Sequence, residues 1–507
     1  MSFLRSNIAV IAVFLLTAAY EWLFGGMRPD VNLKVIPWLW FFVFEAMLFF
    51  PQRRKDENSY SARERLWEDL RRDPLLWLSV AFLGLMGIAF ANQGLCPMCD
   101  AAAIANGENP APDVGFLPFC VNAADHLSVF LWFGPALTAM LAVKHALNRD
   151  GKVLLLQMLV VNGALIAVLG FVQQLCDAPG PLWQPLRGTY IAGSYFFATF
   201  GYPNMAGDMF TTLFCLALGL WRYQIELCNR ELALQKTRRI SKHRLFWLKH
   251  RNLIPAAILL LAVVATLSRA CILLASAAAV LLLTHAAVSF MHKLKKAERV
   301  RTGAYIGGAA ILAAVAIMAF MPDNVNSEMK SVNADELLVR MTGKGDYHPR
   351  IAIQLWREHK LFGCGGEGYQ HFCYSRMTEQ EKKNLWPVGN ANVHNDFLQL
   401  LAEHGAVGAG LLIAILSILF MPAAKTWRAL AQTARFAPPS RQPPQPHSLF
   451  AFPAGAFSVV VAAVCTLLHS LGDCPMRSPA IISLFFVEIA AIEGFLPHID
   501  FRKDKDR

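Results

Sequence analysis

Residues 253–290 read LIPAAILLLAVVATLSRACILLASAAAVLLLTHAAVSF. Two apolar runs, 253–268 and 271–290, adjoin here with almost no loop between them. Each is close to the length of about 20 residues that a helix needs to cross a bilayer core of roughly 30 Å, so the stretch predicts a membrane-embedded helical hairpin. The whole chain agrees, because 55% of its 507 residues are hydrophobic, 16% are charged and the mean hydropathy is +0.38. These values exclude an ordinary water-soluble multidomain protein.

Hydropathy predicts an all-α, polytopic integral membrane protein of about twelve transmembrane helices, with one long outer loop between spans nine and ten. The predicted spans are 7–24, 35–50, 75–93, 126–147, 153–175, 204–221, 253–268, 271–290, 302–321, 405–421, 450–469 and 480–496. The first span resembles a signal peptide, but many more spans follow and no convincing A-x-A site closes it, so we expect an anchor. We see no internal repeat of the inverted kind found in transporters.

The distribution of basic residues predicts the orientation, because Lys and Arg resist translocation across the membrane. Of the 47 Lys and Arg residues, 33 fall in one alternating set, comprising the terminal segments and the loops 51–74, 144–152, 222–252, 292–301 and 422–449. The opposite set holds 14, nine of them in the long loop 322–393. We therefore expect both termini in the cytoplasm and the loops 94–124 and 322–393 outside. The net charge of +11 is a sign of topology rather than of nucleic-acid binding.

Two loops carry further signals. The 51–74 loop alternates charge signs, which is typical of a solvated amphipathic surface helix, with contact to lipid headgroups as the alternative. Seven of the eleven cysteines fall in loops assigned outside, where structural disulfides can persist. The local candidates for pairing are Cys96, Cys99 and Cys120 in one loop and Cys364 and Cys373 in another. Unpaired thiols, or a redox or metal role for the C-x-x-C pair, are the alternatives.

Polar residues at membrane depth are costly, and are therefore functional candidates. The first group is ATFGYPNMAGDMF at 198–210, where Asn204 and Asp208 lie one helical turn apart; the alternative is a simple Pro-led helix start. The second is Arg269, at the joint of the hairpin. Its guanidinium cannot lose its proton and needs an anion or carbonyl oxygens, unless it snorkels to headgroups.

The third group is DYHPRIAIQLWREHKLFGCGGEGYQ at 346–370. Arg350, Trp356 and Arg357 have helical spacing, and the following glycine run ends the predicted helix. A glycine-rich turn with an upstream Arg suits a phosphate group, held by backbone amide donors and a bidentate guanidinium. It is not a P-loop, because no G-K-S/T follows.

The fourth group is NVHNDFLQLLAEHGAVGAGLLIAIL, which leads into span ten. Asn395, Gln399 and Glu403 follow i, i+4, i+8 spacing and share one helical face. A polar stripe that enters the membrane needs partners. His394 stands at the helix start, where it is a plausible general base because a histidine titrates near working pH, although a lone interfacial histidine is more often structural.

These motifs resemble those of the O-antigen ligase and Wzy-type polymerase superfamily of bacterial envelope glycosyltransferases. The matching pieces, in order, are GYPNMAG (201–207), SRA (268–270), R-x5-W from Arg350 to Trp356, GCGGEGY (363–369), VHNDFLQLLAEHGAVG (393–408) and HSLGDCPMRSPA (469–480). The similarity covers about residues 200–480, while the first 190 match only as a set of spans.

The resemblance implies a metal-independent, cofactor-free transfer of a glycan from an undecaprenyl diphosphate carrier to an acceptor hydroxyl on the periplasmic side of the bacterial inner membrane. It implies that Arg269 and Arg350 hold the diphosphate and that His394 activates or places the acceptor. Further candidates for substrate or supporting contacts are Asn204, Trp356, Asn395, Gln399, Glu403, His469 and Asp473.

The resemblance leaves the acceptor open. Lipid A-core as acceptor would make the protein an O-antigen ligase, a growing carrier-linked glycan would make it a polymerase, and a protein hydroxyl would make it an O-oligosaccharyltransferase. Membrane lipids are expected partners and nucleic acid is not. A polysaccharide-lipid transporter or flippase is the alternative from another class, disfavoured because the polar motifs gather at one face.

We accordingly divide the chain into four parts. Residues 1–200 are N-terminal spans, 201–321 are spans with the Asn204 and Arg269 motifs, 322–404 are the periplasmic loop and His394 helix start, and 405–507 are C-terminal spans with a cytoplasmic tail.

Overall fold

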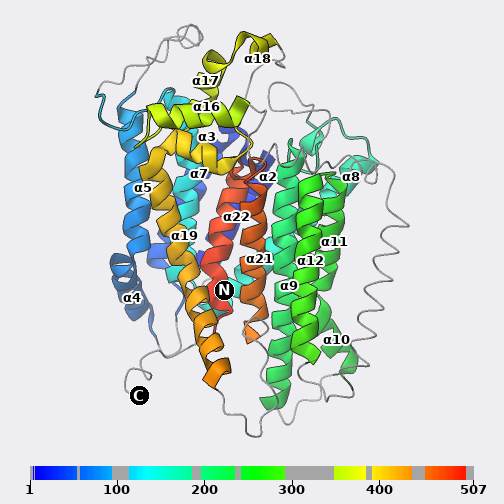
Figure 1. Ribbon diagram of the computed structural model, residues 1–507. Coiled ribbons are helices and arrows are strands. Elements are labelled where there is room, and N and C mark those ends of the chain that lie inside the picture. The colour runs from blue at the N-terminus through cyan, green and yellow to red at the C-terminus, as the bar shows by residue number, and fades with distance from the viewer. Residues whose placement is uncertain are drawn as a thin grey trace.

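The computed structural model describes residues 4, 6–53, 57–93, 114–184, 196–234, 241–291, 298, 347–383, 391–436 and 451–497. Within these ranges the protein is helical and has no strand. Long, roughly parallel helices form a bundle, and short helices form a cap over one end of it (Figure 1).

Seven of the described helical segments are long and apolar enough to cross a membrane. They are Pro29–Phe49 (α3), Pro74–Ala91 (α5), Ala123–Ala146 (α7, Ala123–Leu141, and a π-helical turn), Arg149–Leu175 (α8), Lys242–Ala265 (α10, Lys242–His250, and α11, Leu253–Ala265), Arg269–Met291 (α12) and Asp396–Gln432 within α19 (Asp396–Phe436). Ile8–Trp22 (α2) and Ala454–His469 (α21) are shorter apolar helices. Pro203–Leu234 (α9) and Pro479–Ala490 (α22) complete the bundle.

Every predicted span overlaps one of these helices, except 302–321, which lies outside the described residues. A polytopic helical protein is therefore confirmed, while the exact number of spans stays a prediction. Two helices extend beyond their predicted spans. α9 continues past 221 to Leu234, and α19 begins at Asp396, before the span predicted from 405 and close to the helix start predicted at His394. Both helices extend beyond their apolar runs into polar sequence, which hydropathy does not register as helix.

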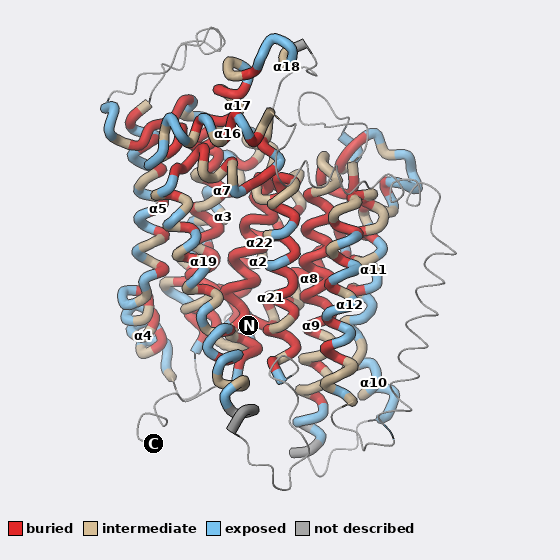
Figure 2. The backbone as a smooth tube through the Cα atoms, viewed as in Figure 1, coloured by how far each residue is buried: buried red, intermediate tan, exposed pale blue. Residues whose placement is uncertain are grey.

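α22 lies near the centre of the bundle, and all twelve of its residues are buried (Figure 2). It packs against α7 and α2, and α21 packs against α9. The outer helices show large apolar side chains on their outward faces, including Trp38 at 75% exposure and Val280 at 66%. An apolar exterior around a buried core is what lipid requires of a helical bundle.

The cap comes from the predicted outer loop, of which 347–383 and 391–395 are described. It contains Tyr347–Glu358 (α16), Gly368–Cys373 (α17) and Glu379–Lys383 (α18). A second apolar core joins it to the bundle end: Ile351, Leu355, Tyr369 and Phe372 pack with Phe119, Val393 and Ala402.

Ser59–Arg72 (α4) and α10 lie at the opposite end from the cap (Figure 1). The predicted surface helix in 51–74 is thus confirmed as α4, which buries Ala62, Leu66 and Leu70 at i, i+4, i+8 spacing. The separation of the two ends agrees with the predicted grouping of loops. Which end faces the cytoplasm stays a prediction.

The predicted local disulfides are wrong where the structure describes them. Cys120 and Cys364 are buried free thiols, so neither the Cys364–Cys373 pair nor a bond to Cys120 is formed. Cys96 and Cys99 lie outside the described residues. Cys120 and Cys364 fill space at the contact between the cap and the bundle, where Gly365 approaches Cys120 closely.

Candidate functional site

His394 lies at the cap end, two residues before α19 begins. Its backbone is left-handed, with φ at 51°, a conformation that a non-glycine residue holds only where the surroundings enforce it. Asn395 supplies that enforcement, since its side chain accepts from the Leu398 amide at 3.1 Å and donates to the Leu471 carbonyl at 3.1 Å. The side chain of His394 is 48% exposed, and its Nδ1 lies 3.4 Å from Oδ1 of Asp473.

Asp473 is buried between α21 and α22 and collects hydrogen bonds from several elements. The Tyr202 hydroxyl donates to it at 3.1 Å, the Asn204 amide donates to Oδ2, and the Cys474 backbone amide donates to Oδ1 at 2.8 Å. Burial opposes ionisation, but the bond from His394 and the charge of His469 outweigh it and hold the pKa of Asp473 well below its usual range. Asp473 is therefore a carboxylate that stabilises positive charge on His394.

His469 extends this set of contacts from Asp473 into the bundle. Nδ1 of His469 lies 2.9 Å from Oδ1 of Asp208, and its Nε2 lies 3.7 Å from Oδ2 of Asp473. Thr466 donates to the other oxygen of Asp208 at 3.0 Å. A neutral imidazole carries one N–H, so a ring that faces two carboxylates satisfies both only as an imidazolium. His394, Asp473, His469 and Asp208 thus form a row in which imidazole rings and carboxyl groups alternate from the exposed surface inward.

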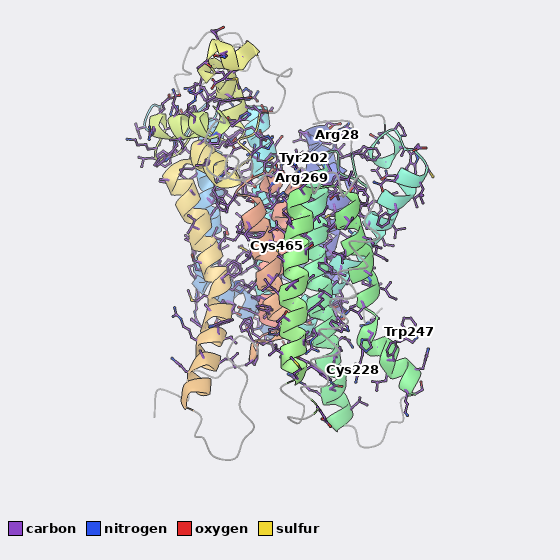
Figure 3. The ribbon with its side chains drawn as sticks, turned by 45° about the vertical axis from the view of Figure 1, so that its right-hand side comes forward. Arg28, Tyr202, Cys228, Trp247, Arg269 and Cys465 are labelled. Atoms are coloured by element: carbon purple, nitrogen blue, oxygen red, sulfur yellow. The ribbon has the colours of Figure 1, made fainter. Side chains whose placement is uncertain are left out.

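The structure places Arg269 at the same end of the bundle as this row, and Arg350 in the cap (Figure 3). Arg269 is the first residue of α12, and Cys271, two residues on, has its sulfur 3.5 Å from the Asn204 carbonyl oxygen and 3.8 Å from His469. Arg269 and Tyr202 lie at the same end of the bundle (Figure 3). Arg350 is on α16 in the cap and pairs with Glu381 at 2.9 Å. Its element still reaches the site, since the ring of His348 lies 6.0 Å from that of His394.

The polar stripe of α19 has a partner that the sequence analysis did not name. Gln399 donates to Glu403 at 3.1 Å, and Glu403 pairs with Arg477 at 2.8 Å. Arg477 also pairs with Glu367 at 2.5 Å and lies over the ring of Trp132. The one signal for it was its place within HSLGDCPMRSPA.

A cavity of about 110 Å³ adjoins this charged group. Its polar wall includes Asp396, Glu403 and Arg477, and its apolar wall includes Leu412, Leu416, Phe485 and Phe486. Trp356, another predicted site residue, is half-buried on α16, and no described contact joins it to His394.

The glycine run does not offer its amides to a phosphate, as the sequence had suggested. The amides of Gly363, Gly365 and Gly366 donate instead to the His359 carbonyl, the Glu403 carbonyl and His126. A Cβ at Gly363 would lie 2.3 Å from the backbone of Glu403. Because they lack side chains, these glycines permit close packing of the cap on α19 rather than the close approach of a phosphate.

His394, Asp473 and Cys474 also form the one group in the described chain whose ligand atoms, all within 4.8 Å of one another, could hold a metal ion. The chemistry fits poorly. The oxygens of Asp473 already accept from Tyr202, Asn204 and the Cys474 amide. Burial raises the pKa of the Cys474 thiol, which disfavours the thiolate that a metal requires.

A polytopic helical bundle with an exposed histidine, backed by buried carboxylates at one end, defines a membrane protein with a candidate acid–base site. Residues 254–413 match the family model described as O-antigen ligase. The matched region runs from α11 into α19 and contains Arg269, Arg350 and His394. The match confirms the resemblance to the O-antigen ligase and Wzy superfamily, a class of bacterial membrane proteins of the glycosyltransferase kind. A comparison with curated proteins gave no match.

Proposed function

We propose that this protein transfers a glycan from an undecaprenyl diphosphate carrier to an acceptor hydroxyl at the periplasmic face of the bacterial inner membrane. It acts as an O-antigen ligase with lipid A-core as acceptor, or as a polymerase that extends a carrier-linked glycan. The observation that carries the proposal is the contact of His394, half exposed at the entry to α19, with the buried carboxylate of Asp473. His394 lies within the region that matches the O-antigen ligase family.

In this mechanism Nε2 of His394 accepts the proton of the acceptor hydroxyl. The hydroxyl oxygen bonds to the anomeric carbon, while the bond from that carbon to the diphosphate oxygen breaks and its electron pair leaves with the diphosphate. Asp473 holds Nδ1–H, which fixes the tautomer, and stabilises the imidazolium as it forms. General-base help of this kind is worth about a hundredfold to ten-thousandfold in rate.

Arg269 and Arg350 stabilise the negative charge that develops on the leaving diphosphate. Arg269 is supported by its place at the start of α12, where the helix dipole also favours an anion. Arg350 would exchange Glu381 for phosphate oxygens, a step that its 47% exposed side chain permits. Two guanidiniums, which stay charged at every relevant pH, supply this charge without a metal ion or cofactor.

The remaining predicted site residues support this arrangement. Asn204, Asn395 and His469 position Asp473 and His394, while Glu403 binds Arg477 and Gln399 donates to Glu403. The adjoining cavity, charged on one wall and apolar on the other, suits the junction between a diphosphate and a polyprenyl chain.

The test uses purified protein with a defined undecaprenyl diphosphate oligosaccharide, with and without lipid A-core. New glycosylated lipid A-core indicates a ligase, and a ladder of longer carrier-linked glycans without it indicates a polymerase. Transfer to an added protein acceptor alone would indicate an O-oligosaccharyltransferase. An intact donor under every condition would contradict the proposal, and loss of turnover in EDTA, restored by a divalent cation, would contradict the metal-free mechanism.

A further inference from the structure

A large cavity lies at the end of the bundle opposite the candidate site, at the junction of α2, α3, α4 and α8. Its volume is about 820 Å³. The lining residues come from the chain before and at the ends of these helices: Ser6, Asn7, Phe49, Phe50, Gln52, Arg53, Ser59, Arg63, Asn148, Asp150 and Leu154.

The floor of this cavity is a fixed polar framework. Gln52 is 7% exposed and bonds to two other segments of the chain. Its side-chain amide donates to Asn7 at 2.8 Å, its side-chain oxygen accepts from the backbone amide of Asn148 at 3.0 Å, and its backbone amide donates to the Ala146 carbonyl at 2.7 Å. Gly151 allows this approach, because a Cβ there would lie 1.9 Å from Oε1 of Gln52. The cavity is thus preformed by contacts that do not involve its charged rim.

Two arginines stand at that rim. Arg53 donates to the Ser59 hydroxyl, and both Arg53 and Arg63 are exposed. Their neighbours on α4 are neutralised, since Arg65 pairs with Glu57 at 2.9 Å and Arg72 with Glu68 at 3.8 Å. Neither Arg53 nor Arg63 forms an ion pair with a carboxylate of the described chain. Among the described lining residues Asp150 is the one acidic side chain, so their formal charges sum to +1.

Exposed aromatic residues place this rim at the level of lipid headgroups. Phe49 and Phe50 are 47% and 41% exposed beside the cavity. Trp67 and Trp77 are 60% and 57% exposed on α4 and the start of α5, and the indole of Trp77 donates to the Arg71 carbonyl at 3.0 Å. Aromatic rings with one polar tip gather at membrane interfaces. A charged cavity at this depth meets lipid headgroups on one side and acyl chains on the other.

We infer that the cavity binds one anionic glycerophospholipid with a hydroxyl-bearing headgroup, of the phosphatidylglycerol type. Its phosphodiester lies between Arg53 and Arg63, its glycerol hydroxyls donate to Asp150, and its acyl chains follow Phe49, Phe50 and Leu154. The single negative charge of the phosphodiester balances the net charge of the cavity. A zwitterionic headgroup would leave one positive charge without compensation, which is why an anionic lipid is preferred.

The test uses the full-length protein in detergent, titrated with phosphatidylglycerol and, separately, with phosphatidylethanolamine and phosphatidylcholine, and read by native mass spectrometry. The variant is R53Q/R63Q. The matched control is R71Q/R72Q, which removes two positive charges from the end of α4, outside the cavity. Helical content and thermal unfolding of both variants confirm that each has folded.

We expect one tightly retained phosphatidylglycerol in the parent and in R71Q/R72Q, with half-saturation within about twofold of each other. In R53Q/R63Q the half-saturating concentration should rise about tenfold or more, because two charge-assisted contacts are lost. Equal weakening in both variants would show diffuse charge attraction and overturn the site. Equal retention of phosphatidylethanolamine or phosphatidylcholine by the parent would overturn the choice of an anionic lipid.

Discussion

His394 combines three properties that bear on its role. Its backbone is held in the left-handed region by the bonds of Asn395, its ring is about half exposed, and its Nδ1 faces a buried carboxylate. The first property fixes the ring direction, the second admits an acceptor, and the third selects the tautomer with a lone pair on Nε2. Together they favour a proton acceptor over a merely structural histidine.

Replacing His394 tests this role. We expect His394→Ala and His394→Gln each to lower turnover about a hundredfold to ten-thousandfold, because Gln keeps a hydrogen-bonding group but cannot accept a proton at neutral pH. The parent rate should rise with pH as the imidazolium of His394 loses its proton, and the Gln variant should lose this rise. The measurement is the pH dependence of single-donor transfer. His371→Gln is the control, because it breaks a similar pair in the cap, 2.8 Å from Asp125. A Gln variant with the parent's profile would leave His394 only an orienting role.

Lysine should not be able to replace Arg269 or Arg350, the two proposed diphosphate ligands. Arg269→Lys and Arg350→Lys keep the positive charge but lose the planar fork that meets two phosphate oxygens. We expect about ten- to a hundredfold weaker use of donor at subsaturating concentration, from the loss of about 1.5 to 3 kcal/mol. Arg357→Lys is the control, an exposed arginine on the same α16 as Arg350. Parent-like donor use in either variant would remove that arginine from the diphosphate site.

Glu367 should make stability depend on pH. Burial raises its pKa from 4.5 to about 6, although Arg477 opposes the shift. The folded protein therefore binds more protons than the unfolded chain between these values, and stability falls as pH rises through this window. Glu367→Gln stays neutral, so it should match the parent near pH 4.5 and exceed it by up to about 2 kcal/mol above pH 6.5. Thermal unfolding in detergent at several pH values measures the difference. A constant difference across the window would contradict the shift.

Single residues also show how far sequence reasoning reaches. His394 and Arg269 stand out because a polar group beside an apolar run is costly wherever the chain goes. The Asp208–His469 contact joins residues 261 positions apart, and the pattern around either one contains nothing about the other. The i, i+4 spacing of His469 and Asp473 was a local signal, which marks both as facing one side of the helix end.

Among the elements, α19 decides how the site is presented. Its first part, 396–404, carries the stripe of Gln399 and Glu403 under the cap, and a break at Gly405 turns the chain into the long span (Figure 1). Gly405 has φ at 63°, and a Cβ there would lie 2.3 Å from the Leu361 carbonyl oxygen. The break thus depends on a residue without a side chain.

Gly405→Ala should therefore disturb the site from outside it. The substitution meets both a disfavoured backbone region and the Leu361 backbone, and we expect a loss of about 2 kcal/mol or more in stability together with reduced transfer. Gly410→Ala lies in the same helix with open space around it and should be neutral or stabilising by up to about 1 kcal/mol. Unfolding and transfer assays on both variants check the contrast. Equal behaviour of the two would contradict the proposed requirement at the break.

The sequence predicted the helices themselves better than the contacts between them and the positions of their ends. The i, i+4, i+8 stripe identified the buried polar face of α19 because helical spacing is local. The glycine run was misinterpreted, since glycine permits both a phosphate approach and a backbone approach, and only the position of α19 shows which occurs. Hydropathy marked the apolar spans of α9 and α19 but not the polar turns by which both helices extend beyond them.

At the scale of the whole molecule, the bundle separates two kinds of chemistry. The cap end gathers His394, Asp473, Arg269 and Arg477, while α4 and α10 at the other end carry basic residues, including those around the proposed lipid cavity. This difference between the two ends of the bundle suits a reaction at one membrane face. It is less suited to a transporter, whose site must open to both faces. The count of Lys and Arg in alternate loops predicted this separation, because each loop as a whole either crosses the membrane or remains in the cytoplasm.

The orientation of these ends is tested by thiol labelling of intact cells. Cys176 is exposed and the other described cysteines are buried, so Cys96, Cys99 and Cys176 are first replaced by Ser. Single probes are then placed at the exposed residues Gln354 on α16 and Lys242 on α10. We expect a membrane-impermeant maleimide to label Gln354→Cys in intact cells and Lys242→Cys only after permeabilisation, because basic loops remain in the cytoplasm. If Lys242→Cys is labelled in intact cells and Gln354→Cys is not, the predicted orientation is wrong. His394 would then lie on the cytoplasmic side, where a periplasmic acceptor cannot reach it.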